Sequence, residues 1–247
     1  MKKILEMKNV SLTYQTLEDE ITAIKDLSFY CFDGEFISII GPSGCGKTTV
    51  LNLIAGLIKA TSGEILIGEK NTQENLGYML QKDHLFPWRT IEKNVYLPLE
   101  IKKICTPENK KYACDLLDKY GLENFKKNYP DELSGGMRQR VALIRTLASK
   151  PNLLLLDEPF SALDYQTRIA VCDDVYNIIK SEKKSAILVT HDISEAISMS
   201  DVIIVLTERP ARVKKIFTPK IDGVSPLKRR ESPDFSVWFE KIWKELN

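Results

Sequence analysis

Long apolar segments, cysteine pairs and histidines are all scarce in this sequence. The longest apolar runs, such as Val202–Leu206, are of strand length and far below the roughly 18 residues that a membrane-spanning helix needs. Glu6 follows the first lysines and no apolar stretch comes after it, so we expect no secretory signal peptide. The five cysteines contain no Cys-x-x-Cys pair and there are only two histidines, which argues against a disulfide framework and against a zinc site.

An excess of charge of either sign is also lacking. Lys and Arg total 35 against 34 Asp and Glu, a formal net charge of +1. A dedicated nucleic-acid binder, or a chain held to anionic lipid by charge alone, would show a marked basic excess. Present instead are 43% hydrophobic and 28% charged residues in a chain of 247, the composition of an ordinary folded protein of one large or two small domains.

Short apolar strands that alternate with helical patterns predict an α/β fold. The first 35 residues alternate apolar and polar runs and contain the turn dipeptide Asp33-Gly34, which suggests antiparallel strands. Phe36–Ile40 reads as a buried strand, and similar apolar runs follow at 65–67, 76–80, 153–156, 186–189 and 202–206. Helical spacing between the later runs predicts a parallel sheet that is covered on both faces.

Two helices have clear boundaries in the sequence. Thr106-Pro107 supplies an N-cap and a first-turn proline, and Gly121 marks a C-terminal stop. Near 218–234 prolines and glycine punctuate a polar stretch, which predicts a linker. Beyond it, apolar residues at helical spacing predict an amphipathic helix that docks on the chain's own core: Phe235, Trp238, Phe239, Ile242, Trp243 and Leu246.

The segment Gly41-Pro42-Ser43-Gly44-Cys45-Gly46-Lys47-Thr48 matches the phosphate-binding pattern G-x-x-x-x-G-K-[ST]. Its glycines let backbone N–H groups turn toward phosphate oxygens, and the helix that follows adds the positive end of its dipole. Lys47 would meet the β- and γ-phosphates, and the Thr48 hydroxyl would complete a Mg²⁺ shell. Since the pattern lies between a predicted strand and a predicted helix, we expect this loop, through Thr49, to bind ATP.

Two acids end the buried strand 153–156. In open α/β sheets, ligands bind at the carboxyl ends of the parallel strands. Asp157 could therefore hold Mg²⁺, directly or through water, while Glu158, on the opposite side, could polarise a water aimed at the γ-phosphate. Acids at a strand end are by themselves usually solvated turn residues. The phosphate-binding loop upstream is what favours the catalytic interpretation.

A second glycine motif opens a predicted helix at Leu133-Ser134-Gly135-Gly136-Met137-Arg138-Gln139. Ser134 and the two glycines at a helix N-terminus would make a second anion site. Together the two motifs resemble those of the ATP-binding subunits of ABC transporters, in the family's order and over essentially the whole chain. The resemblance implies a P-loop NTPase (RecA-like) core with an N-terminal antiparallel β subdomain and an inserted α-helical subdomain.

The resemblance also implies roles for residues that no local pattern singles out. Tyr14 would stack on adenine, although a strand tyrosine can simply pack on its sheet. Gln81 would contact Mg²⁺ and sense the γ-phosphate, and Ser161-Ala162-Leu163-Asp164 would cross a dimer interface. His191 would contact the γ-phosphate, although a lone histidine at a strand end is more often structural. The expected catalytic set is Glu158, His191, Gln81 and Lys47, and the expected metal ligands are Thr48, Gln81 and Asp157.

In the family such subunits pair head to tail, with each ATP between the phosphate-binding loop of one chain and the Ser134–Met137 motif of the other. A chain of 247 residues holds one ATPase half, so we expect the other half to be a second copy. The expected division of this single ABC ATPase domain, 1–247, is an ATP-binding core with its β subdomain at 1–81 and 150–218, a helical subdomain at 82–149, and a linker and terminal helix at 219–247.

Phe86-Pro87-Trp88, shortly after Gln81, looks like nitrate/sulfonate/taurine-type importer ATPases, as does the run 157–164. The implied function is ATP hydrolysis that energises uptake of a small solute through a separate permease, at the cytoplasmic face of the membrane. An extracellular solute-binding protein would take part indirectly, and no nucleic acid would. Two alternatives stay open: Phe86 and Trp88 only pack the helical lobe, or the chain is a non-transport ABC ATPase acting on nucleic acid or ribosomes. A P-loop kinase would not explain Ser134–Met137 or His191.

Overall fold

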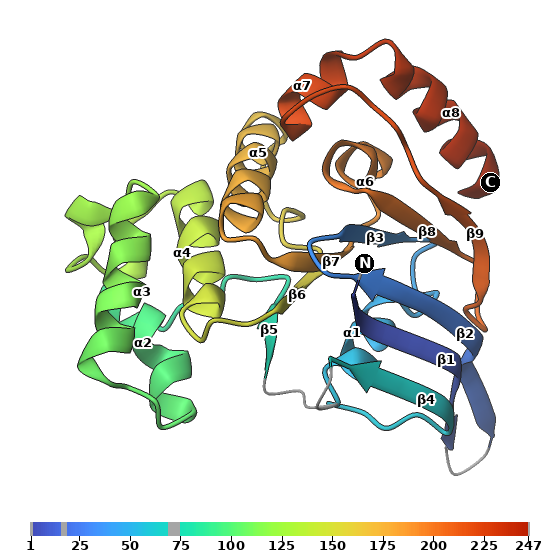
Figure 1. Cartoon of the computed structure of the whole chain (residues 1–247), viewed down its shortest axis with the longest axis horizontal. Helices are drawn as coiled ribbons and strands as arrows, with labels where there is room; N and C mark the ends of the chain where they lie inside the picture. Colours follow the sequence, from blue (N-terminus) through green and yellow to red (C-terminus); the bar gives the residue numbers. More distant parts are fainter. Residues whose placement is uncertain (1, 16–18, 69–74, 247) are drawn as a thin grey trace.

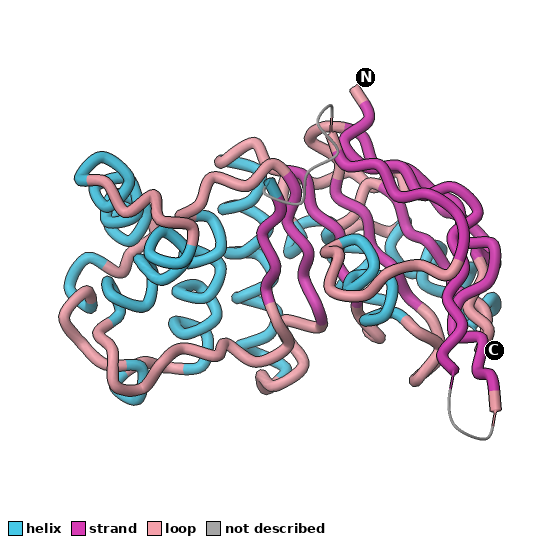
Figure 2. Tube along the Cα trace, turned by 90° about the horizontal axis from the view of Figure 1, so that it is seen from below, coloured by secondary structure: helices cyan, strands magenta, loops and turns pink. Residues whose placement is uncertain are grey.

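The computed structural model describes residues 2–15, 19–68 and 75–246, which form two β-sheets flanked by helices (Figure 1). The smaller sheet is antiparallel, and its strands lie in the order β2 (Glu20–Phe32), β1 (Lys3–Gln15) and β4 (Ser62–Ile67). Figure 2 shows that the strands gather in one part of the molecule, while the other part is helical. The antiparallel strands expected in the first 35 residues are thus present.

The larger sheet has six strands, five of them parallel. Every residue of β3, β6 and β7 is buried, which explains why these strands read as continuous apolar runs. The last strand, β9, is antiparallel, forms an edge and exposes Lys214 and Lys215, and the sequence did not predict it. In order across the sheet the strands are β5 (Leu76–Met79), β6 (Leu153–Asp157), β7 (Ser185–Val189), β3 (Phe36–Ile40), β8 (Val202–Leu206) and β9 (Val213–Phe217).

Eight α-helices surround the sheets in the described part of the chain, with short 3₁₀ turns at Glu123–Phe125 and Pro130–Glu132. The hydroxyl of Thr106 accepts a hydrogen bond from the Asn109 N–H at 3.2 Å, so the predicted cap is confirmed. The helices are α1 (Lys47–Ile54), α2 (Ile91–Ile101), α3 (Pro107–Lys119), α4 (Gly135–Leu147), α5 (Tyr165–Ser181), α6 (Ile193–Met199), α7 (Pro226–Glu231) and α8 (Asp234–Leu246).

Alternation along the central strands divides the interior into separate cores. On β6, Leu154 and Leu156 belong to the core shared with α2, α4 and α5, whereas Leu153 and Leu155 belong to the core shared with α1 and the small sheet. Successive side chains of a strand point to opposite faces, so one strand anchors both layers. The sheet therefore links the helical side of Figure 1, where α2, α3 and α4 lie, to the strand-rich side.

Two local expectations differ from the structure. Asp33-Gly34 does not close a hairpin, because it joins β2 to β3 in the other sheet, and the Gly34 N–H donates to the Ser185 hydroxyl at 2.8 Å. The connection between β1 and β2 includes residues 16–18, which lie outside the described residues. The stretch expected to be a linker contains α7, and its proline and serine begin that helix.

The terminal helix α8 docks on α6, β8 and β9, as its apolar spacing predicts (Figure 1). Ile242 is fully buried, and the rings of Trp238 and Phe217 meet edge to face at 6.3 Å. Trp243 does not reach this core, because it stacks on Phe239 and stays 54% exposed. The helix thus uses only one part of its aromatic set for docking.

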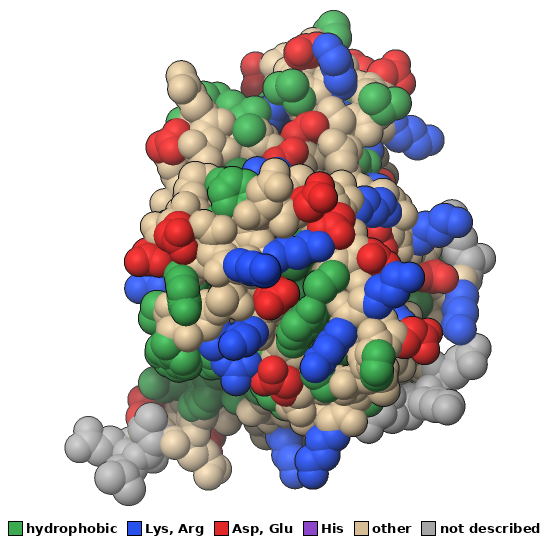
Figure 3. Space-filling view, turned by 90° about the vertical axis from the view of Figure 1, so that its left-hand side faces the viewer, with side chains coloured by type: hydrophobic (Ala, Val, Ile, Leu, Met, Phe, Trp, Pro, Cys, Tyr) green, Lys and Arg blue, Asp and Glu red, His purple; other side chains and the backbone are tan. Residues whose placement is uncertain are grey.

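The face over α2 and α3 carries side chains of both charge signs, interspersed with hydrophobic ones (Figure 3). Exposed hydrophobic residues in this part of the chain include Trp88 and Ile101, each 71% exposed. Within residues 2–15, 19–68 and 75–246, no helix combines the length and apolar character required to cross a bilayer.

Gly63 makes the closest backbone approach in the small sheet. Its φ is +85°, and a Cβ atom there would lie 2.4 Å from the Asn9 carbonyl oxygen of β1. We expect Gly63→Ala to lower the free energy of unfolding by about 3 kcal/mol, because strand backbone cannot move aside as a side chain can. Thermal or urea unfolding measures this.

Gly34 is the matched control for that substitution. Its φ is also positive, at +79°, but no neighbouring atom lies within 4 Å of the position that an alanine methyl group would take. Gly34→Ala should cost only about 1 kcal/mol, the ordinary cost of a left-handed residue. Equal losses in the two variants would contradict a steric origin of the Gly63 effect.

Candidate functional site

The phosphate-binding loop joins the carboxyl end of β3 to the start of α1. Gly44 and Gly46 have φ of +70° and +118°, conformations that a side chain disfavours and that turn the loop around on itself. Lys47 is only 6% exposed, and its Nζ donates to the carbonyl oxygens of Gly41 and Pro42, both at 2.9 Å. The ammonium group is therefore held at the centre of the loop by the loop's own backbone.

A hydroxyl and a carboxylate meet beside this loop. The Thr48 hydroxyl in the first turn of α1 donates to Asp157 Oδ1 at the end of β6, at 2.9 Å. The single hydrogen of the Tyr78 hydroxyl is shared between the other oxygen of Asp157, at 3.4 Å, and Asn52 Oδ1, at 3.1 Å. Burial raises the pKa of Asp157, and the two hydroxyl donors oppose this shift. Carboxylate and hydroxyl oxygens are the ligands that Mg²⁺ prefers, so the donor set fits that ion.

Glu158 and His191 form the neighbouring pair. Glu158 Oε2 lies 3.0 Å from His191 Nδ1, and the side chains are 22% and 58% exposed. Glu158 has a φ of +43°, and its N–H donates to the Val189 carbonyl of β7 at 2.9 Å, which fixes the turn after β6. Because a carboxylate only accepts, Nδ1 is the donor in this contact, and Nε2 is left for another partner.

Gln81 reaches the same region through one serine. Its Nε2 donates to the Ser161 hydroxyl at 3.3 Å, and this hydroxyl donates to the Glu158 carbonyl at 2.9 Å. Cys45, inside the loop, is buried, and burial raises the pKa of its thiol, so it is present as a neutral packing group. Tyr14 lies on β1, 43% exposed, and no contact joins it to the loop in the described part of the chain.

The Ser134–Met137 motif starts α4, on the far side of β5 and β6 from α1 (Figure 1). The Ser134 hydroxyl accepts from the Met137 N–H at 3.3 Å, so it caps the helix. A Cβ at Gly136 would lie 2.8 Å from Val171 of α5, which means that glycine is needed for these helices to pack. Hydrogen bonds join Thr48 to Asp157, and Glu158 to His191 and, through Ser161, to Gln81, while the two groups are linked by the adjacent positions of Asp157 and Glu158. We call these five residues and Lys47, the neighbour of Thr48, the network, and Ser134–Met137 lies outside it.

Sequence reasoning missed several polar residues that support the network. Tyr78 contacts both Asp157 and Asn52, Arg209 donates from Nη2 to the Gly44 carbonyl at 3.0 Å, and Thr190 donates to Glu195. The contacts of Tyr78, Asn52 and Arg209 join elements that are far apart in the sequence, so no local spacing pattern predicts them. The Thr190–Glu195 contact is local, but its partner Arg168 is not.

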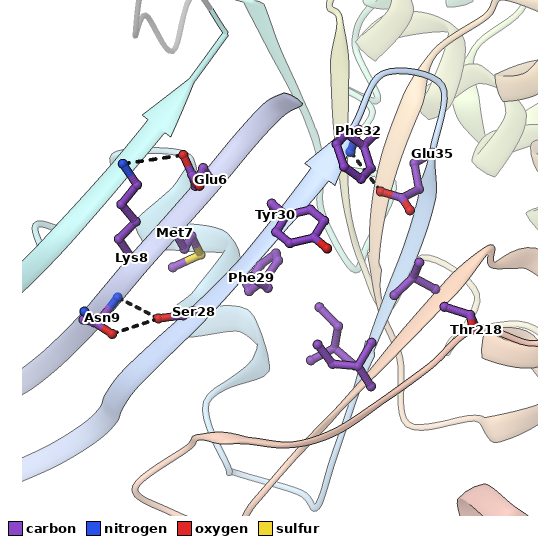
Figure 4. A pocket seen from close by; sticks show the side chains of 13 residues that line it. Glu6, Met7, Lys8, Asn9, Ser28, Phe29, Tyr30, Phe32, Glu35 and Thr218 are labelled. Atoms are coloured by element: carbon purple, nitrogen blue, oxygen red, sulfur yellow. Dashed lines mark hydrogen bonds and ion pairs between the residues drawn. The ribbon is translucent and has the colours of Figure 1, made fainter. Parts of the chain in front are cut away.

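A cavity of about 580 Å³ lies between β1–β2 and β8–β9, apart from this network (Figure 4). Met7, Phe29 and Tyr30 provide apolar walls, and Glu35 hydrogen-bonds to the Phe32 N–H at its rim. None of the candidate site residues lines this cavity, so the cavity and the residues with phosphate-binding and acid–base chemistry lie in different parts of the molecule. We take the catalytic region to be the network, because the phosphate-binding loop and the acids lie there.

Four features together define a P-loop nucleoside triphosphatase: strand β3, the glycine loop, helix α1, and the acids at the end of β6, which is separated from β3 by β7. The ABC transporter family profile matches residues 24–161. The uncharacterized ABC transporter ATP-binding protein YtlC of Bacillus subtilis is 51% identical, covering 98% of this chain and 95% of its own length. The aliphatic sulfonates import ATP-binding protein SsuB of Bacillus cereus is 39% identical, covering 98% and 94%.

A solved structure agrees in fold. The ATP-binding cassette MJ0796, as a dimer in a post-hydrolysis state with ADP and Pi, has a TM-score of 0.72 and 33% identity over 87% of this chain and 99% of that one. The chain belongs to the ABC transporter family of ATP-binding proteins. It is an ATPase that uses ATP and Mg²⁺, and the fold predicted from the motifs is confirmed.

Asn94 fixes the loop that carries Phe86 and Trp88. Their rings stack at 4.9 Å, and Asn94, fully buried on α2, accepts from the Phe86 N–H at 2.7 Å. Its amide group also donates to the carbonyl oxygens of Phe86, Arg89 and Thr90 at 3.0–3.1 Å. The two amide hydrogens serve two of these three carbonyls at a time, and the Thr90 carbonyl also accepts from the Asn94 N–H, so one side chain links the loop to the helix through backbone groups.

We expect Asn94→Ala to lower the free energy of unfolding by about 2–3 kcal/mol, because buried backbone groups lose their partners. It should also make the loop at 86–90 more sensitive to limited proteolysis. Lys93→Ala, at an exposed neighbouring position on α2, should change stability by less than about 0.5 kcal/mol. The interpretation fails if the two variants unfold at the same denaturant concentration.

Proposed function

We propose that this chain is the ATP-hydrolysing subunit of an importer that takes up a small solute, of sulfonate, nitrate or taurine type, through a separate permease. The sulfonate importer ATPase supports this, because the similarity extends over nearly the full length of both chains. The exposed Phe86–Trp88 stack is suited to packing against a partner protein, since it offers an apolar surface on a loop fixed by Asn94. The subunit would lie at the cytoplasmic face of the membrane.

The observation that carries the catalytic assignment is that two contacts converge beside the loop: Thr48 with Asp157, and Glu158 with His191. In our proposal Lys47 leaves the Gly41 and Pro42 carbonyls for the β- and γ-phosphates. Thr48, Asp157 and Gln81 hold Mg²⁺, which would neutralise charge on the phosphate oxygens. The roles of Thr48 and Asp157 rest on donor chemistry and on their contact beside the loop, whereas the role of Gln81 rests on the family resemblance.

Glu158 would orient and polarise the attacking water, because it is the more exposed of the two acids and accepts a hydrogen bond from His191. The free Nε2 of His191 would then face the γ-phosphate. The exposed ring of Tyr14 would stack on adenine. Gly41–Thr49 would surround the phosphates with backbone N–H groups.

We further propose that two copies pair head to tail, because Ser134–Met137 lies outside the network of its own chain. In such a dimer the motif would meet the ATP held by the partner copy, and the dimeric state of MJ0796 supports this arrangement. A non-transport ABC ATPase acting on nucleic acid remains less favoured, since acidic and basic side chains are mixed on the face in Figure 3 and the net charge is +1.

Glu158→Gln should reduce ATP hydrolysis about 100-fold or more, because the amide cannot accept the proton of the attacking water. ATP binding should persist, and the variant should accumulate as an ATP-bound dimer in size-exclusion chromatography with Mg-ATP. Glu182→Gln, at the end of α5 beside Lys119, is the control and should behave as wild type. A Glu158→Gln chain that stays monomeric with and without Mg-ATP would count against the dimer.

Lys47→Ala should weaken ATP binding about 10- to 100-fold, the loss expected for charge-assisted contacts to phosphate. Equilibrium binding of a fluorescent ATP analogue measures this directly. Lys59→Ala, an exposed lysine just beyond α1, should leave affinity unchanged. Wild-type ATPase activity in Lys47→Ala would overturn the site assignment.

A further inference from the structure

Arg168 occupies an unusual position on the first turns of α5. Its Nη2 donates to the Leu163 carbonyl at 2.9 Å, within the segment Ser161–Asp164. Its other nitrogens face two carboxylates: Nη1 lies 3.8 Å from Asp192, and Nε lies 4.0 Å from Glu195. Nε is buried and has no hydrogen-bond partner in the described part of the chain. The guanidinium group therefore donates a hydrogen bond to Leu163 on one side, while on the other side it lies near Asp192 and Glu195 without a hydrogen bond to either.

Glu195 holds the loop that carries His191. Its side chain is 4% exposed, and Oε2 accepts from the Thr190 hydroxyl at 2.5 Å. The same hydroxyl accepts from the Asp192 N–H at 3.0 Å, so both neighbours of His191 are fixed by one acid. Burial raises the pKa of Glu195 to about 7, and the Thr190 hydroxyl and the Arg168 charge oppose that shift. A buried acid of this kind needs its partners, because removal of either exposes its desolvation cost.

The other end of this chain of contacts is the glycine motif. A Cβ at Gly135 would lie 3.1 Å from Leu163 Cδ2, so the start of α4 packs closely on the Leu163 side chain. The Leu163 carbonyl in turn accepts from Arg168. A displacement of the Ser134–Met137 motif would therefore move Leu163, and Arg168 would follow its charge-assisted hydrogen bond.

We propose that Arg168 and Glu195 are positioning residues that couple the Ser134–Met137 motif to His191 within one chain. The inference rests on the proposed head-to-tail dimer, in which that motif and His191 serve two different ATP molecules. The gaps of 3.8 and 4.0 Å exceed hydrogen-bond distance, which leaves Arg168 room to close on Asp192 and Glu195. Closure would shift Glu195 and Asp192, and with them the Thr190–Asp192 segment that carries His191.

The competing explanation is a static clamp that only fastens α5 to α6. A clamp would affect stability, and the two residues would contribute to it independently of nucleotide turnover. A coupling pair would instead change kcat at nearly constant KM for ATP, because ATP contacts themselves are untouched. The two residues would also act as a unit, so their effects on kcat would not add.

The test uses the full-length chain with Arg168→Lys, Glu195→Gln and the double variant, assayed for steady-state ATPase activity. Each single variant should lower kcat about tenfold and leave KM within about twofold. The double variant should also fall about tenfold, rather than the roughly hundredfold expected for independent sites. Unchanged kcat in both single variants, or additive losses in the double variant, would refute the coupling.

Thr190 provides a second, independent test if Glu195→Gln folds poorly. Thr190→Ser keeps the hydroxyl that contacts Glu195 and should retain kcat within about twofold, whereas Thr190→Val should lower it about tenfold. Equal kcat values in the two Thr190 variants would contradict the proposed coupling. Thermal unfolding of all variants should be compared with Glu182→Gln, whose ion pair with Lys119 lies at the other end of α5.

Lys47→Ala separates failure of this inference from failure of the proposed function. If Lys47→Ala is inactive while the Arg168 and Glu195 variants equal wild type, only the coupling is wrong. If Lys47→Ala is as active as wild type, the site assignment itself is wrong and the coupling falls with it.

Discussion

The parallel register of β6, β7 and β3 is the constraint on which the rest of the structure depends. Strands that run the same way present their carboxyl ends at one edge of the sheet. The phosphate-binding loop leaves β3, Asp157 and Glu158 end β6, and Thr190 leads from β7 into His191. Thr48 and Asp157, 109 positions apart in the sequence, therefore meet within hydrogen-bond distance. A slip of one residue in either pairing would turn these side chains to the wrong face.

Close packing of glycine against a neighbouring helix explains the placement of the second motif. Gly136 is opposed by Val171, and Gly135 by Leu163, so α4 approaches α5 more closely than larger residues permit. The motif is thereby fixed relative to the segment that follows Glu158, although it shares no contact with the loop around Lys47. The two motifs of one chain therefore lie at separate places, which is the geometric basis of the proposed pairing with a second copy.

Local chemistry made part of this architecture predictable, since the glycine loop, the Thr106 cap and the buried strands follow from neighbouring residues. The turn dipeptide Asp33-Gly34 led to a wrong expectation, because a turn sequence does not determine whether the strands that it joins belong to the same sheet. Edge strand β9 was not predicted, because its exposed lysines interrupt the apolar pattern of a strand. Candidate site residues that belong to a family motif could be predicted from the sequence. The side chains that hydrogen-bond to them could not, because the packing of distant elements determines those partners. Tyr78, Arg209 and Arg168 contact Asp157, Gly44 and Glu195 across 79, 165 and 27 positions.

The adjacent acids Asp157 and Glu158 lie in unlike environments, and this difference supports the separate roles proposed for them. Asp157 is the last residue of β6, 7% exposed, with both oxygens engaged by hydroxyl donors. Glu158 leaves the strand with a positive φ, which swings its side chain toward His191 and solvent. A buried acid between hydroxyls suits a bound cation, and an exposed one beside an imidazole suits proton transfer from water. The backbone turn between them, fixed by the Val189 carbonyl, is what directs the two neighbouring carboxylates to different surroundings.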